Sequence, residues 1–137
     1  MEFAPAGEII GEAHRVRTVR ISGSALLPDG EYVFVDMYCT DPSCDCRKTM
    51  VQVLHNGKHV ATINYGWESP SFYRRWMGCE ADEPDMPQMH GASIDITSPN
   101  LVPPQAMLSL FNALLNERWI GMFRKHYKAV KAALARE

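Results

Sequence analysis

Three of the four cysteines in this chain are concentrated in one short segment, Tyr38-Cys-Thr-Asp-Pro-Ser-Cys-Asp-Cys-Arg47. Cys39, Cys44 and Cys46 lie in this segment, and Cys79 follows after 32 intervening residues. Four cysteine thiolates can complete a tetrahedral structural zinc site, with Zn–S bonds of about 2.3 Å and no open position for a substrate. The spacing therefore predicts that these four cysteines bind one structural zinc ion.

An iron–sulfur cluster is the alternative metal group. The plant-type [2Fe–2S] motif is C-x4-C-x2-C with a remote fourth cysteine, whereas this chain has C-x4-C-x-C. The loop is one residue shorter than the motif that surrounds two irons, which favours zinc. If Cys79 lies too far from the other three, His90 is the alternative fourth ligand. Arg47 and Lys48 follow the cluster and are expected to offset the negative charge of the bound thiolates.

Catalytic residues are not marked by any motif. A nucleophilic cysteine needs a base beside a thiol of lowered pKa, and His55, His59 and His90 show no diagnostic arrangement with the cysteines. No nucleophile-elbow serine or phosphate-binding glycine loop is present in the sequence. We therefore expect a non-enzymatic interaction or adaptor module. The alternative from a different class is an enzyme with its site in the 66–91 loop, using His90.

The charge is unevenly distributed along the chain, although the net charge is only −2. Residues 76–117 contain six acidic residues and no lysine or arginine, whereas residues 118–137 contain six basic residues and one acid. The basic end, together with Arg74-Arg75-Trp76, could contact nucleic acid. The net charge and the lack of a groove-binding motif argue against nucleic acid, and a protein partner stays open.

The length and composition are those of one globular domain: 137 residues, 46% hydrophobic and 22% charged. The first residues lack the basic start and apolar run of a signal peptide. No run approaches the roughly 20 apolar residues that a membrane span needs. We therefore expect a cytoplasmic protein, in which reduced cysteines act as metal ligands rather than as disulfides.

Five segments have the β-branched composition or the period-two pattern of strands: residues 14–21, 32–39, 49–55, 59–65 and 92–97. Asn56-Gly57 is the preferred two-residue hairpin turn. Ser69-Pro70 is typical of a helix start, and Gly78 is placed to end that short helix just before Cys79.

Two amphipathic helices close the chain. The first begins at Pro103-Pro104, and the second follows a break near Asn116. The sequence thus predicts an α+β fold, in which an antiparallel β-meander of about five strands carries a short middle helix and a C-terminal helical pair packed on the sheet. Residues 1–137 form a single domain in this prediction, with residues 1–12 as a loose arm.

The cysteine-rich segment resembles a Tyr-Cys-x-x-Pro-x-Cys-Asp-Cys-Arg motif of small uncharacterised bacterial proteins. The segment Phe123-Arg-Lys-His-Tyr127, followed by Lys128 and Lys131, is similar to the helix that closes such proteins. The resemblance covers about ten residues well and the helix loosely. It implies a metal site at Cys39, Cys44 and Cys46, and it implies no particular activity.

Overall fold

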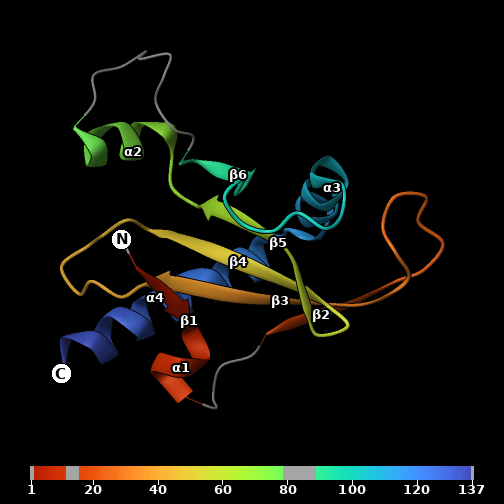
Figure 1. Ribbon diagram of the computed structural model, residues 1–137. Helices are drawn as coiled ribbons and strands as arrows, with labels where there is room; N and C mark the ends of the chain where they lie inside the picture. Colours follow the sequence, from red (N-terminus) through yellow and green to blue (C-terminus); the bar gives the residue numbers. More distant parts are fainter. Residues whose placement is uncertain (1, 12–15, 79–88, 137) are drawn as a thin grey trace.

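The computed structural model describes residues 2–11, 16–78 and 89–136, which form an antiparallel sheet with four helices (Figure 1). The strands are β1 (Phe3–Pro5), β2 (Arg17–Ile21), β3 (Gly30–Cys39), β4 (Lys48–His55), β5 (Lys58–Gly66) and β6 (Gly91–Ile94). The helices are α1 (Ala6–Ile10), α2 (Pro70–Met77), α3 (Pro104–Leu114) and α4 (Glu117–Ala135). The predicted α+β class, with a C-terminal helical pair on the sheet, is confirmed.

The predicted meander runs in sequence order from β2 to β6, and every pairing is antiparallel. The β4–β5 turn is formed by Asn56 and Gly57, both with positive φ, as the two-residue hairpin signal predicts. The last strand ends at Ile94, earlier than predicted. Asp95 Oδ1 accepts hydrogen bonds from the Thr97 backbone N–H and hydroxyl, so the chain makes a turn directly after the strand.

The N-terminal segment is ordered against the sheet, in contrast to the loose arm predicted for residues 1–12. β1 and β2 pair with the same edge of β3: β1 with its C-terminal end and β2 with its N-terminal half. α1 packs against α4, and Ala6 is fully buried. Three residues of strand are too few to show a period, and their stability comes from pairing with β3. These contacts are tertiary, which is why the local sequence does not reveal them.

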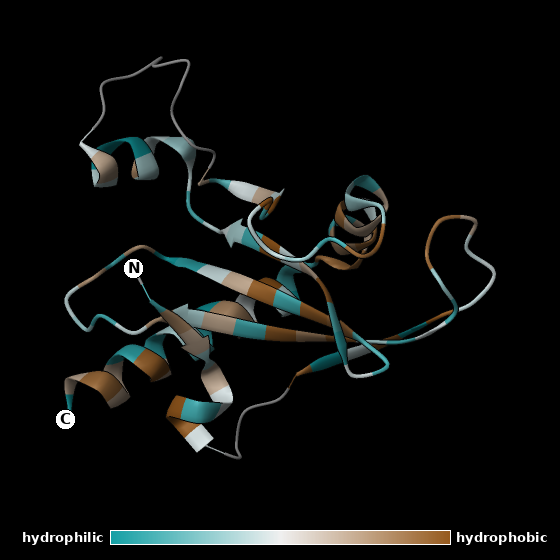
Figure 2. Ribbon diagram, in the orientation of Figure 1, coloured by the Kyte–Doolittle hydropathy of each residue, from teal (hydrophilic) through white to brown (hydrophobic). Residues whose placement is uncertain are grey.

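The helical pair covers the sheet with the apolar stripe that the sequence predicts. Trp119, Phe123, Tyr127 and Val130 of α4 are buried, and Figure 2 shows hydrophobic and hydrophilic bands alternating along this helix. Asn116 Oδ1 accepts a hydrogen bond from the Trp119 backbone N–H at 2.8 Å, which separates α3 from α4. None of the described helices is long and apolar enough to cross a membrane.

Candidate metal centre

Three of the four predicted ligands come together in the structure. The Sγ atoms of Cys39, Cys44 and Cys46 all lie within 4.8 Å of one another. Cys39 and Cys46 are fully buried, and Cys44 is half-buried. Zn–S bonds of about 2.3 Å in a tetrahedron place the sulfurs about 3.8 Å apart. The three sulfurs are therefore close enough together to be ligands of one ion.

The loop between β3 and β4 brings these sulfurs together through a turn at Asp41. Its Oδ1 accepts hydrogen bonds from the Ser43 backbone N–H at 2.9 Å and from the Ser43 hydroxyl at 2.7 Å. The Cys44 N–H donates to the Asp41 carbonyl oxygen at 3.1 Å. Aspartate favours such turns because its carboxylate can bond to the backbone two residues later. The turn folds Cys44 back towards Cys39.

Helix α2 supports the far end of the loop, where Arg47 has a φ of +46°. This left-handed conformation is unusual for a residue with a large side chain. The Tyr73 hydroxyl of α2 donates to the Arg47 carbonyl oxygen at 2.6 Å and so holds this conformation. Close packing here requires Gly66, because a Cβ at that position would lie 2.6 Å from the Tyr73 hydroxyl.

Helix α4 supports the loop from another side. Lys131 Nζ donates to the carbonyl oxygens of Cys39 at 3.0 Å and Asp41 at 2.7 Å. Lys131 is thus the cation that contacts the cysteine loop backbone. Arg47 and Lys48 were expected to offset the charge of the bound thiolates. Arg47 forms salt bridges with the carboxylates of Asp45 and Glu68, and Lys48 Nζ lies over the Phe3 ring.

Two of the three clustered thiols have a raised pKa. Burial, followed by the neighbouring Cys44, raises the pKa of Cys46 to about 12. Burial also raises the pKa of the Cys44 thiol. A reactive cysteine needs a lowered pKa, whereas a metal ion deprotonates a coordinating thiol directly. Cys44 and Cys46 therefore lack the lowered pKa of a free catalytic thiolate.

The fourth ligand is not determined among the described residues, because Cys79 lies outside them. The helix predicted to lead to it is confirmed. Ser69 Oγ accepts a hydrogen bond from the Phe72 backbone N–H, and Gly78 ends the helix with a φ of +71°. α2 also contacts the cysteine loop through Tyr73.

His90, the alternative fourth ligand, lies outside the three-cysteine group, as do the candidate bases His55 and His59. His90 is exposed, and its Nδ1 donates to the Glu68 carbonyl oxygen at 2.6 Å. His55 stacks on Tyr32 with ring centroids 4.5 Å apart. His59 Nε2 lies 2.7 Å from the Thr62 hydroxyl. Within the described ranges, the cluster that could hold a metal therefore consists of cysteines only.

A buried polar cluster was missed by the sequence analysis. His126 Nδ1 lies 2.7 Å from Asp36 Oδ2, and the Tyr38 hydroxyl donates to the same oxygen at 2.6 Å. Burial and the Asp36 carboxylate raise the pKa of Tyr38 far above its ordinary value. A signal was available: Asp36 shares a strand face with aromatic residues, and His126 follows Phe123 by three positions on α4. The pair connects the central strand to α4.

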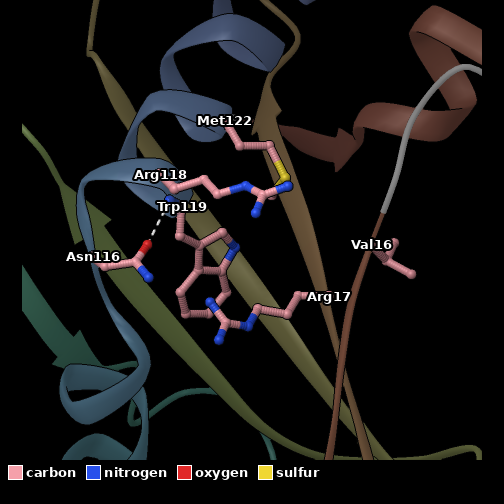
Figure 3. Close-up of a pocket in the computed structure, with 6 residues that line it drawn as sticks. All are labelled: Val16, Arg17, Asn116, Arg118, Trp119 and Met122. Carbon is pink, nitrogen blue, oxygen red and sulfur yellow. Dashed lines mark hydrogen bonds between the residues drawn. The ribbon is translucent and has the colours of Figure 1, made fainter.

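A pocket of about 340 Å³ near the start of α4 lies apart from the cysteines (Figure 3). The Arg17 guanidinium lies over the Trp119 ring at 4.7 Å from its centroid. Arg17 also donates to the Leu114 carbonyl oxygen at 3.3 Å. These contacts connect β2 to the junction between α3 and α4, so we assign Arg17 a structural role.

Comparison of this chain with protein-family models, curated proteins and solved structures finds no match in any of the three.

Proposed function

We propose that this protein is a small zinc-binding interaction or adaptor module, in which Cys39, Cys44, Cys46 and Cys79 hold one structural ion. The observation that carries the proposal is the convergence of three cysteine sulfurs within 4.8 Å of one another. Four thiolates would leave zinc no open position, so the proposal assigns the ion no catalytic role. The three described cysteines form no disulfide, so their sulfur atoms are available as ligands.

A single ion explains the sulfur geometry better than a [2Fe–2S] cluster. A two-iron cluster with four cysteines has two on each iron, so a third sulfur belongs to the other iron and lies further away. Here Cys39, Cys44 and Cys46 are mutually close. Zinc is favoured over other ions because tetrahedral thiolate sites are its usual structural environment.

A structural role follows from the number of elements that meet at the loop. The Thr40 backbone N–H donates to the Glu2 carbonyl oxygen at 2.8 Å, next to β1. Tyr73 connects the loop to α2, and Lys131 connects it to α4. An ion at this junction would hold several elements together. Since the unfolded chain has no preformed site, the free energy of metal binding would stabilise the fold.

Metal analysis of the purified protein and of two loop variants tests the proposal. We expect one zinc per chain in the wild type and in Ser43→Ala, whose side chain is not a ligand. Cys44→Ser should lose the metal and melt at a lower temperature. A Cys44→Ser protein with unchanged metal content and melting temperature would refute the structural role. Two irons per chain with visible absorption bands would contradict the zinc site and indicate an iron–sulfur cluster.

If Cys44→Ser does not fold, the wild type supplies the same test. Treatment with a chelator should lower its melting temperature, and stoichiometric zinc should restore it. A melting temperature that does not respond to chelation, in protein shown to have lost its metal, would contradict the proposal.

A further inference from the structure

A cleft of about 580 Å³ lies beside the cysteine loop, between that loop, the end of β5 and α4. Its size falls in the range of roughly 300–1,000 Å³ that is common for small-molecule sites. Asp45 and Arg47 of the loop form one side, and Trp67 and Glu68, which follow β5, form another. None of its lining residues is a cysteine, so the cleft is distinct from the metal cluster.

The acidic groups of the cleft are already paired. Arg47 forms salt bridges with Asp45 at 3.0 Å and with Glu68 at 3.5 Å. Asp45 also accepts a hydrogen bond from the Tyr127 hydroxyl at 2.8 Å. The Arg47 guanidinium therefore neutralises both carboxylates. The left-handed backbone conformation of Arg47 is held by the hydrogen bond from Tyr73. A cation entering the cleft would compete with this guanidinium.

The α4 side of the cleft carries two further cations, Arg124 and Lys128. They are four residues apart and therefore neighbours on one helix face. Both are exposed, and within the described residues neither forms a salt bridge or a hydrogen bond with its side chain. Two like charges at this spacing repel each other. An oxyanion placed between them would relieve that repulsion and accept their hydrogen bonds.

The aromatic residues Trp67 and Tyr127 supply the apolar part of the lining. Their rings meet edge to face, with centroids 5.4 Å apart. Trp67 is half-buried, so part of its indole is available to a ligand. A flat aromatic surface next to paired cations suits a molecule with a planar ring and an anionic group.

We propose that this cleft binds a small aromatic oxyanion, whose phosphate or carboxylate is held by Arg124 and Lys128 and whose ring packs against Trp67. The site goes beyond the proposed metal function and does not depend on which ion the cysteines hold.

Binding of four probes to the purified full chain tests this site by calorimetry. Adenosine monophosphate carries a ring and a phosphate, and phenylacetate carries a ring and a carboxylate. Adenosine lacks the anion, and inorganic phosphate lacks the ring. We expect at least one of the two aromatic anions to bind about tenfold more tightly than adenosine and inorganic phosphate, because both parts of the ligand make contacts. Their comparison tells which oxyanion is preferred.

Substitutions on α4 locate the site. Arg124→Gln and Lys128→Gln should each weaken binding by about fivefold to tenfold, as expected for the loss of one charge-assisted hydrogen bond. Lys125→Gln is the matched control, because Lys125 is exposed on the same helix but does not line the cleft. The nuclear magnetic resonance signal of the Trp67 indole N–H should shift on binding, and its assignment is checked with Trp67→Phe.

Three results would overturn the proposal. These are no shift of the Trp67 indole with either aromatic anion, an affinity for both aromatic anions no higher than that for adenosine, or equal weakening by Lys125→Gln. The metal content of the same preparation separates the two proposals. Zinc-loaded protein that binds no probe refutes the cleft, whereas metal-free folded protein that binds the probe refutes only the metal site.

Discussion

The Tyr127 hydroxyl of α4 donates a hydrogen bond to Asp45 Oδ1 at 2.8 Å. Asp45 is the residue between Cys44 and Cys46. This contact joins the C-terminal helix to the cysteine loop. The same two residues line the cleft. The cysteine loop therefore contributes residues to both the cysteine cluster and the candidate ligand site.

Replacing Tyr127 with phenylalanine should lower the free energy of unfolding by about 1 kcal/mol, because a hydrogen bond is lost while the ring packing is kept. Tyr65→Phe is the control. Tyr65 is also buried, but its hydroxyl makes no hydrogen bond within the described residues. Urea unfolding at fixed metal concentration measures both variants. Equal stability of Tyr127→Phe and wild type would show that the contact contributes nothing.

The affinity for zinc should rise steeply with pH. Without an ion, burial and the neighbouring cysteines raise the pKa of Cys46 to about 12, and burial raises that of Cys44. These thiols are therefore protonated at neutral pH, and binding must release their protons. Each released proton increases the apparent affinity by up to about tenfold per pH unit. The stability that the metal supplies is thus present at high pH and is lost as the pH falls.

Competition with a chelator of known affinity between neutral and mildly alkaline pH measures this slope. At least two protons should be released per zinc bound, one each from Cys44 and Cys46. An affinity that does not change with pH would mean that the thiols are not the ligands.

The buried pair of His126 and Asp36 should contribute strongly to stability. His126→Ala removes the imidazole from a carboxylate that is almost completely buried. Removing one hydrogen-bond partner from a buried carboxylate costs about 1–3 kcal/mol. The neighbouring Lys125→Ala, at an exposed position, should stay within about 0.5 kcal/mol of wild type. Urea unfolding compares the two, and a His126→Ala variant as stable as Lys125→Ala would contradict this role.

Much of the fold was predictable because its signals are local. The turn at Asn56-Gly57 fixes one hairpin through its positive φ angles. Ser69 and Gly78 mark the two ends of α2 through capping hydrogen bonds. Cys39, Cys44 and Cys46 are close together in the sequence, and this spacing correctly predicted that they are close together in the structure. Each of these features depends on residues that are neighbours along the chain.

The features that were missed depend on distant residues. Asp36 and His126 are 90 positions apart, and their contact exists only because α4 packs across β3. Lys131 reaches the Cys39 carbonyl oxygen over 92 positions. The β1 strand is stabilised by pairing with β3, and its sequence has no period-two pattern that would have predicted a strand. The cleft has the same origin, since its walls come from three separate segments.

The ordered N-terminal segment can be tested at Ala6. Ala6→Glu should destabilise the protein by about 3 kcal/mol, because the side chain is fully buried beneath α4 and a charge there has no room or partner. Ala25→Glu introduces the same charge at an exposed position and should cost less than about 0.5 kcal/mol. Thermal unfolding of both variants is sufficient. Equal melting temperatures of the two variants would contradict the burial of Ala6 and support a loose N-terminal arm.

X-ray absorption spectroscopy at the zinc edge of the purified protein tests the central claim most directly. We predict one zinc per chain, surrounded by four sulfur atoms at about 2.3 Å. In Cys79→Ser the shell should fall to three sulfurs and one lighter atom, whereas His90→Ala should keep all four. A wild-type shell with three sulfurs and one nitrogen, retained in Cys79→Ser, would exclude Cys79 as the fourth ligand. A shell dominated by nitrogen and oxygen, or a protein without stoichiometric metal, would contradict the account.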